Sequence, residues 1–410
     1  MVEHTGRGGM YAYADALCRS LCESGADVTV LTNSLWPDFP ATARAFPATA
    51  RAFAETSAET RPRPYKLERC LFEFIEKKEQ WSQLHWAADR LWRGLNNSLR
   101  RNRFAIRACC DIVHIQIGVP LIDQFFLRSL ARLLPVVLTV HDVQPHCDRF
   151  NTRRSFLQRY FHIPHRLIVH FQDGKRQLVD NWGVCGDRID VIPHGIIPLH
   201  NPPTLTDARK KLNLPLDGRI VLFFGSIRDN KGLDVLLKAL EIVRSRRPRI
   251  LLVVAGALPR AASFEPYSNM IKRYDLSQHV RAFVHFIAEE DVDYFFAASD
   301  LVVLPYLKFE SQSGVLLRAY AHKKPVVVSN VGAMAELVAS DEVGLVVEPG
   351  APDSLAEAII NVLDGLDKFQ SHYSSELENK YSWKHVAELT MRSYELAAKK
   401  IKKSKCKVQN

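Results

Sequence analysis

Residues 301–350 alternate short apolar runs with polar loops, and this alternation limits the fold more than any other feature of the chain. The runs Val302–Leu304, Val326–Val328 and Leu345–Val347 are rich in β-branched residues. Runs of this kind are typical of strands that are buried on both faces of a parallel sheet. A helical segment separates the first two runs. The region therefore predicts an α/β domain in which strands and helices follow one another.

A loop of small residues connects the first of these strands to the helix, and it contains Glu310, Ser313 and Gly314. A loop that ends on a helix start presents backbone N–H groups without partners and the positive end of the helix dipole. Both favour an anion such as a diphosphate. The carboxylate of Glu310 would bind sugar hydroxyls beside that anion. The segment therefore predicts a sugar nucleotide site.

The same alternation runs through both halves of the chain. Further strands are expected at 27–31, 112–116, 136–140, 167–169, 189–192, 219–224, 250–255 and 282–286. A chain of 410 residues is too long for one ordinary core. We therefore expect two Rossmann-like, doubly wound domains facing each other across a cleft. Their expected limits are 1–197 and 198–378, and residues 379–410 are expected to form a helix that crosses back to the first domain.

The start of the first domain is irregular. A helix is expected at 10–24, with Ala14, Leu17, Cys18 and Leu21 on one face. Gly8 and Gly9 belong to a glycine-rich loop ahead of this helix, and only residues 1–4 remain to form the first strand. An insertion is expected near 38–64, because FPATARA occurs twice in succession over residues 39–52. The proline in each copy excludes a coiled coil.

Composition indicates a globular protein outside the membrane. The chain is 47% apolar and 24% charged, and it has no apolar run long enough to span a bilayer. Its first ten residues lack the apolar region of a signal peptide, so we expect a cytoplasmic location. The eight cysteines show no zinc-ligand spacing, and no metal is expected.

Positive charge is concentrated in two segments of this chain, whose formal net charge is +10. Six arginines lie between residues 90 and 107, and six lysines lie between 399 and 407. No nucleic-acid recognition motif accompanies them, so nucleic acid is not expected as a partner. Either they contact an anionic membrane at the inner face of the cell membrane, or the lysine tail is simply solvated. A long helical stretch is expected at Leu67–Arg107, and its tryptophans fit either a membrane interface or core packing.

Polar residues that follow the strands mark where ligands bind in open α/β sheets. His141, His170 and His194 follow three strands of the first domain. In the second domain, residues 225–232 follow a strand and precede a helix. Arg228 and Lys231 lie three residues apart in this loop, where both can reach one anion. Such fixed cations can compensate the charge that grows on a leaving diphosphate.

Together these residues resemble the retaining glycosyltransferases of family 4, which have the GT-B fold. Gly225, Arg228, Lys231 and Gly232 resemble that family's G-x-x-x-x-K-G diphosphate motif. The loop from Glu310 resembles its E-x7-E region, and residues 344–350 resemble its T-G-L-L-V-x-P-G ending. This chain differs in carrying an SQSGV loop and Arg318 where the family has a second glutamate.

The resemblance implies both an activity and a set of residue roles. The expected reaction is retaining transfer of a sugar from a nucleoside diphosphate sugar to a hydroxyl acceptor, without a required cofactor. The implied catalytic residues are His141, Glu310, Arg228 and Lys231. The implied donor-binding residues are Gly225, Arg228, Lys231, Glu310, Ser313, Gly314, Val315 and Arg318. The implied acceptor-binding residues are Gly8, Gly9, His141 and His170. The expected acceptor is a lipid-linked glycan or a precursor of a cell-surface polysaccharide.

Two other readings share this fold. One is a sugar nucleotide epimerase, which needs no acceptor, and the other is an inactive partner subunit that only binds a nucleotide sugar. The substitution at Arg318 and the short first strand favour the inactive reading. A nicotinamide dehydrogenase fits least, because no G-x-G-x-x-G motif follows a strand with an acidic residue about 20 positions later.

Overall fold

The computed structural model describes residues 1–2, 8–34, 63–73, 82–116, 118–143, 152–309 and 312–408. The chain divides into two compact units. Unit 1 comprises Met1–Gly195 and Tyr381–Asn410, and unit 2 comprises Ile196–Lys380. These bounds fall close to the domain limits expected at 197 and 378. The duplicated segment at 39–52 lies outside the described residues.

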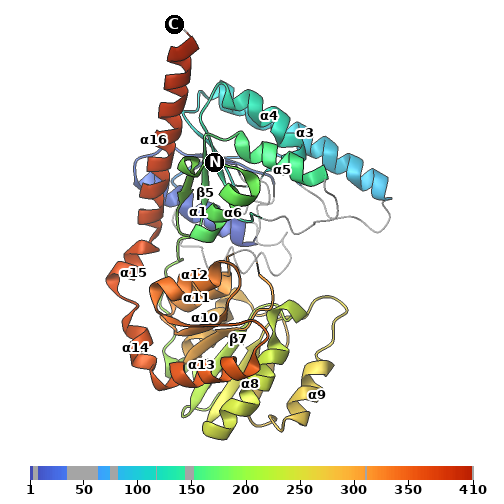
Figure 1. Ribbon diagram of the computed structural model, residues 1–410, viewed down its shortest axis with the longest axis vertical. Helices are drawn as coiled ribbons and strands as arrows, with labels where there is room; N and C mark the ends of the chain where they lie inside the picture. Colours follow the sequence, from blue (N-terminus) through green and yellow to red (C-terminus); the bar gives the residue numbers. More distant parts are fainter. Residues whose placement is uncertain are drawn as a thin grey trace. The chain divides into compact units, whose positions relative to one another are not determined.

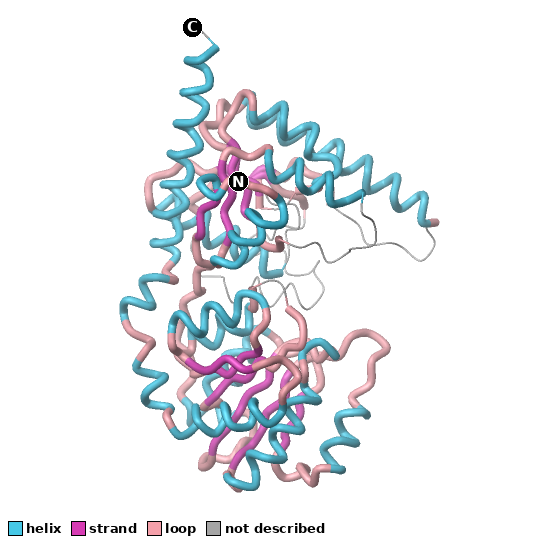
Figure 2. The backbone as a smooth tube through the Cα atoms, in the orientation of Figure 1, coloured by secondary structure: helices cyan, strands magenta, loops and turns pink. Residues whose placement is uncertain are grey.

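Unit 1 is built on parallel strands, and Figure 2 shows them gathered at its centre. The strands are β1 (Thr29–Leu31), β2 (Lys66–Glu68), β3 (Val113–Ile115), β4 (Val136–Thr139), β5 (Arg166–Val169) and β6 (Ile189–Val191). β1 pairs with β2, and β3 to β6 pair in chain order. Val2 joins the two groups, because it forms parallel bridges to Leu31 and Ile115. The short segment at the amino terminus thus takes the place of a first strand.

Helices cover both faces of this sheet. They are α1 (Gly8–Glu23), α3 (Gln83–Arg107), α4 (Pro120–Ala131), α5 (Thr152–His162), α6 (Gln172–Trp182) and α16 (Trp383–Val408). Alternate strand residues point to opposite faces. Leu138 packs in the core that includes α4 and α6, whereas the neighbouring Val137 packs in the core of α1 and α16. The four residues expected on the inner face of α1 are all buried.

The expectation of one helical stretch over Leu67–Arg107 is wrong. Lys66–Glu68 is strand β2, in parallel register with Thr29–Leu31, and the helix begins only at Gln83. The strand was missed because two of its three residues are charged and exposed, which hides the apolar signal of a strand. The strand expected at 282–286 is likewise displaced, because it spans Val280–Phe283.

Unit 2 has a six-stranded parallel sheet of order β12-β11-β10-β7-β8-β9. The strands are β7 (Arg219–Phe224), β8 (Ile250–Ala255), β9 (Val280–Phe283), β10 (Leu301–Leu304), β11 (Val326–Ser329) and β12 (Gly344–Val347). β10 and β11 are buried along their whole length, as the apolar runs predict. The chain reverses its direction of winding between β7 and β10, and ligands of open α/β sheets bind at such a point.

The helices of unit 2 form layers on the two faces of this sheet (Figure 1). They are α7 (Leu205–Lys211), α8 (Leu233–Arg246), α9 (Glu265–Arg273), α10 (Glu289–Ala298), α11 (Gly314–Ala321), α12 (Gly332–Asp341), α13 (Pro352–Asp364), α14 (Leu366–Ser371) and α15 (Ser375–Lys380). α8, α9 and α13 share one apolar core with alternate residues of the strands. α10, α11 and α12 lie on the other face.

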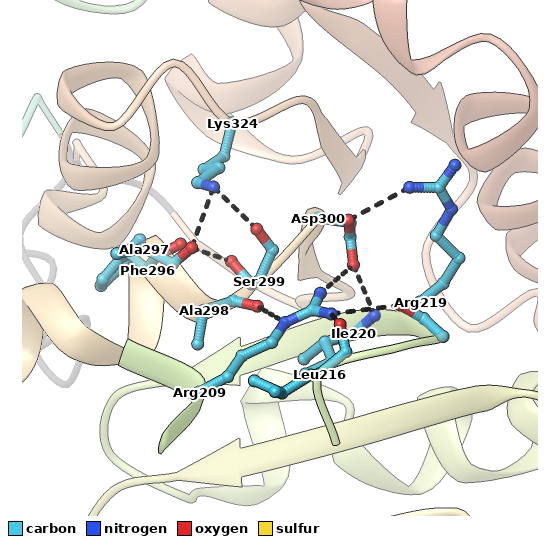
Figure 3. Close-up of polar contacts among 11 residues, drawn as sticks. Arg209, Leu216, Arg219, Ile220, Phe296, Ala297, Ala298, Ser299, Asp300 and Lys324 are labelled. Atoms are coloured by element: carbon cyan, nitrogen blue, oxygen red, sulfur yellow. Dashed lines mark hydrogen bonds and ion pairs between the residues drawn. The ribbon is translucent and has the colours of Figure 1, made fainter. Parts of the chain in front are cut away.

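A buried ion network fixes the amino ends of β7 and β10 (Figure 3). Arg209 is 3% exposed, and its Nη2 lies 2.8 Å from Oδ2 of Asp300. The same carboxylate oxygen accepts from the backbone N–H of Ile220. Arg209 and Lys324 donate to backbone carbonyls at the end of α10. This network occupies the strand ends opposite to those where ligands bind, so it stabilises the sheet rather than a site.

Candidate active site

The loop that follows β7 in unit 2 depends on glycine at both of its ends. Gly225 has φ +105°, and Gly232 has φ +67° at the start of α8. A Cβ atom on Gly232 would lie 2.0 Å from the carbonyl oxygen of Pro305. Only glycine allows this conformation and this close approach. The two glycines therefore place the carboxyl end of β7 against the segment that follows β10.

Hydrogen bonds join this loop to residues 305–309. The backbone N–H of Leu307 donates to the carbonyl of Asn230 at 2.9 Å. The side-chain amide of Asn230 donates to the carbonyl of Lys308 at 3.3 Å. Two loops from neighbouring strands are thus held as one surface, and Arg228 and Lys231 lie on the first of them.

Lys231 lies in an aromatic environment. Its Nζ is 3.5 Å from the ring centroid of Tyr306 and 4.2 Å from that of Phe309. Burial, and to a smaller extent the positive charge of Arg228, lower the pKa of Lys231 to about 8. The guanidinium of Arg228 is exposed and donates to Oγ of Ser226. Within the described part of the chain, neither cation forms an ion pair with a carboxylate. Two adjacent cations without a counterion form a site that favours an anion.

The first turn of α11 contributes a second element of this site. Ser313 caps the helix, because its hydroxyl accepts from the backbone N–H of Leu316. A Cβ atom on Gly314 would meet nothing within 4 Å, so space is open above this turn. A Cβ atom on Gly225 would lie 3.4 Å from Val315 Cγ2, which places the start of α11 beside the end of β7. The backbone amides of the first turn are thus available to an anion near Gly225.

Two other residues implied by the resemblance have different outcomes. Glu310 lies outside the described residues. Arg318 is held against α10, with its Nη2 2.8 Å from Glu289 and its Nε 3.0 Å from Asp293. The same oxygen of Asp293 lies 2.7 Å from His322. Arg318 is thus paired with two carboxylates of α10. Its role in donor binding stays a prediction.

The histidines that follow the strands of unit 1 form one cluster. His170 donates from Nδ1 to the carbonyl of Ile192 at 3.0 Å, and its Nε2 lies 3.1 Å from Nδ1 of His141. Nε2 of His141 lies 3.0 Å from the side-chain oxygen of Gln116. The ring of Tyr13 is within 5.2 Å of the rings of His141, His170 and His194. The strand ends therefore bring these side chains together as the sequence predicts.

This histidine cluster is electrically neutral near pH 7. Burial lowers the pKa of His170 to about 3 and that of His194 to about 4. Burial, together with the neighbouring histidines, also holds the pKa of His141 well below its usual value. Neutral rings offer hydrogen-bonding nitrogens without charge, and these suit hydroxyl groups better than phosphate. Among the described residues, no group of three or more His, Cys, Asp or Glu side chains is arranged to hold a metal ion.

The sequence predicts that Gly8 and Gly9 lie in a loop ahead of the first helix. They are instead the first residues of α1. The residues before them, 3–7, are outside the described part. Sequence reasoning also missed Gln116, Tyr13 and Trp383, which surround the histidines. Gln116 carried a usable signal, because it is a polar residue at the end of an apolar strand. Trp383 carried none, because it joins the cluster from more than 180 residues away.

Two family models match the two halves of the chain. The model described as Glycosyltransferase Family 4 matches residues 7–198, and the model described as Glycosyl transferases group 1 matches residues 206–376. The chain belongs to the group 1/family 4 type of glycosyltransferases. A D-inositol 3-phosphate glycosyltransferase of Paenarthrobacter aurescens is 26% identical over 395 residues, which cover 94% of this chain and 92% of the relative. The transferase activity expected from the sequence is therefore supported at the level of glycosyl transfer.

Solved structures of glycosyltransferases share the fold. The structure of a glycosyltransferase of Rickettsia africae matches over 97% of this chain and 97% of its own chain, with a TM-score of 0.71 and 18% identity. HepE of Anabaena in complex with UDP covers 96% of this chain and 98% of its own, with a TM-score of 0.68 and 17% identity. The glycosyltransferase therefore has the GT-B fold, as expected.

Proposed function

We propose that this glycosyltransferase moves a sugar, with retention of anomeric configuration, from a nucleoside diphosphate sugar to a hydroxyl group. The observation that carries the proposal is the pair Arg228 and Lys231 on the loop after β7. These two cations are close enough for the charge of Arg228 to lower the pKa of Lys231, and both lack a carboxylate partner among the described residues. Departure of a nucleoside diphosphate places growing negative charge on the diphosphate. Preformed cations stabilise that charge without having to reorganise during the reaction.

The donor is proposed to bind unit 2. Arg228 and Lys231 would hold the diphosphate, and the backbone amides at Gly314 and Val315 would contact the same group. Ser313 and Gly225 shape this surface, and Glu310 would bind hydroxyls of the transferred sugar. Fixed cations and amides compensate the negative charge of the leaving diphosphate, so its departure requires no metal. The acceptor hydroxyl would attack the anomeric carbon from the same side as the leaving group, so retention requires no covalent intermediate. HepE of Anabaena, which has the same fold, has been solved with UDP and with UDP-glucose, and this supports a nucleotide sugar as donor.

The acceptor is proposed to bind unit 1. His141 and His170 offer neutral ring nitrogens, and Gly8 and Gly9 begin α1 without side chains that would block an approaching ligand. His141 would orient the attacking hydroxyl. We propose a lipid-linked glycan or a polysaccharide precursor as acceptor, used at the inner face of the cell membrane. The relatives named D-inositol 3-phosphate glycosyltransferase supply a second acceptor class, a phosphorylated cyclitol.

A thermal-shift screen against nucleoside diphosphate sugars tests the proposal. A donor at about a hundred times its dissociation constant should raise the free energy of unfolding by about 2.7 kcal/mol. The stabilising compound is then incubated with candidate acceptors, and the products are analysed. Transfer with release of nucleoside diphosphate supports the proposal. Conversion of the sugar nucleotide without an acceptor identifies an epimerase, and binding without any turnover identifies an inactive subunit.

A further inference from the structure

Helix α3 exposes a row of large apolar side chains. Leu84 is 83% exposed and Leu91 is 49% exposed, and the row continues along the helix. Its further members are Leu95, Leu99 and Ile106, with Trp92 beside them. Spacings of four and seven residues place these side chains on one face of a helix. Soluble proteins rarely expose a continuous apolar row of this length, and such a row marks an interaction site.

This row is separate from the face by which α3 packs in unit 1. The packing face approaches α4 closely, because a Cβ atom on Gly94 would lie 2.3 Å from Ile122 Cδ1. Arg101 is fully buried on that face, with Nη1 2.6 Å from Oδ1 of Asp123. Figure 1 shows α3 and α4 side by side. α4 also exposes apolar side chains, because Phe125 is 66% exposed and Leu121 is 51% exposed.

The surface around these side chains is positively charged. α3 contains six arginines and one aspartate, and α4 contains one of each. Both aspartates are already paired, Asp89 with Arg93 and Asp123 with Arg101. Arg100 donates to the carbonyl of Cys70 and Arg90 lies over the ring of Trp86, so helical spacing places both away from the apolar row. The exposed arginines that flank the row are Arg103, Arg107 and Arg128. We call this surface the α3–α4 face; it consists of the exposed leucines, Ile106, Trp92 and Phe125 together with these arginines.

We propose that the α3–α4 face binds the surface of an anionic lipid bilayer. Apolar side chains that enter the acyl boundary, with arginines at the level of the phosphate groups, are the combination by which helices lie in a membrane interface. A helix of 25 residues is about 37 Å long, and a straight edge of that length suits a flat surface. The same face of a second copy would oppose arginine to arginine, so charge disfavours self-association. None of the described helices has the length and apolar character to cross a bilayer.

This inference deepens the proposed membrane location by naming the surface, and it does not depend on glycosyl transfer. The full-length protein is sedimented with vesicles of phosphatidylcholine alone and of phosphatidylcholine with 30% phosphatidylglycerol. We expect binding to the anionic vesicles only, with an affinity that falls as salt is raised. The readout is partition and not turnover, so its failure leaves the donor site untouched.

Two variants separate the apolar row from the arginines. Leu84→Ser with Leu91→Ser should lower partition at least about tenfold, because two side chains lose their burial in lipid. Arg103→Ala with Arg107→Ala should lower it about twentyfold or more, since each arginine near an anionic surface contributes about fivefold. The matched controls lie in unit 2. Leu205→Ser with Leu216→Ser removes two exposed leucines, and Arg249→Ala with Arg260→Ala removes two exposed arginines. Both controls should bind like the native protein.

A third variant tests the lysine tail, in which Lys402, Lys403, Lys405 and Lys407 are replaced by alanine. The proposal is overturned if this variant loses binding while Leu84→Ser with Leu91→Ser retains it. It is also overturned if native protein binds neutral vesicles equally well, or if it binds an acidic protein through α3 and binds no vesicle.

Discussion

Lys231→Ala is expected to lower kcat/KM for the donor about tenfold to a hundredfold, because loss of one charge-assisted hydrogen bond costs about 1.5–3 kcal/mol. The side chain rests on Tyr306 and Phe309, so its ammonium group is held in position before the donor arrives. Lys238→Ala is the matched control. Lys238 lies on the neighbouring helix α8, where its Nζ is 3.5 Å from Asp234, and its loss should leave the rate unchanged.

The pH dependence gives an independent check on the same residue. Burial and Arg228 lower the pKa of Lys231 to about 8, so its positive charge is present below that pH and is lost above it. Because kcat/KM reports groups of the free enzyme, it should decline as pH rises through about 8. Arginine keeps its charge up to about pH 12, so Lys231→Arg should remove this decline. A native rate in Lys231→Ala, or a decline that persists in Lys231→Arg, would show that Lys231 does not contact the diphosphate.

Unit 1 is expected to lose stability steeply as pH falls below 6.5. Burial lowers the pKa of His114 to about 3, of His170 to about 3 and of His194 to about 4, whereas each is near 6.5 in the unfolded chain. The unfolded state therefore binds protons that the folded state excludes. Stability from these histidines is fully present above pH 6.5 and is lost as pH falls towards their folded pKa values. Between pH 7 and pH 5 each histidine should lower the free energy of unfolding by about 2 kcal/mol.

Tryptophan fluorescence measures this loss in unit 1 alone, because all six tryptophans lie in that unit. Urea unfolding is followed at pH 7 and at pH 5. His114→Gln should weaken the pH dependence, since His114 contacts Thr139 and Tyr394 in the buried core and glutamine does not titrate. His200→Gln is the control at a residue that lies in unit 2 and outside the cluster. An equal pH dependence in the native protein and in His114→Gln would contradict the neutral state of the buried histidines.

Local sequence patterns predicted the parts of the fold that depend on burial. The β-branched runs of β10 and β11 are buried on both faces, and the buried face of α1 matches the expected helical spacing. Strand β2 was not predicted, because Lys66–Glu68 is recognisable only by its pairing with residues far away in the sequence. Non-local pairing of a short, exposed strand leaves no local signal.

The candidate site shows the same division. The strand ends placed His141, His170, Arg228 and Lys231 correctly on their elements, because a polar residue after an apolar strand marks the ligand edge of a parallel sheet. The sequence did not reveal that Arg318 pairs with Glu289 and Asp293 of α10, or that Trp383 reaches the histidine cluster. Both contacts join elements that are distant in the sequence and that meet only when the whole unit packs.

Calorimetric titration with nucleoside diphosphates tests most directly whether Arg228 and Lys231 together bind a diphosphate. UDP is the first ligand to titrate, and the other nucleoside diphosphates follow until one binds the native protein. The double variant Arg228→Ala with Lys231→Ala should then bind that ligand at least about a hundredfold more weakly, while Lys238→Ala binds it normally. Equal affinity of the double variant and the native protein would contradict the central claim.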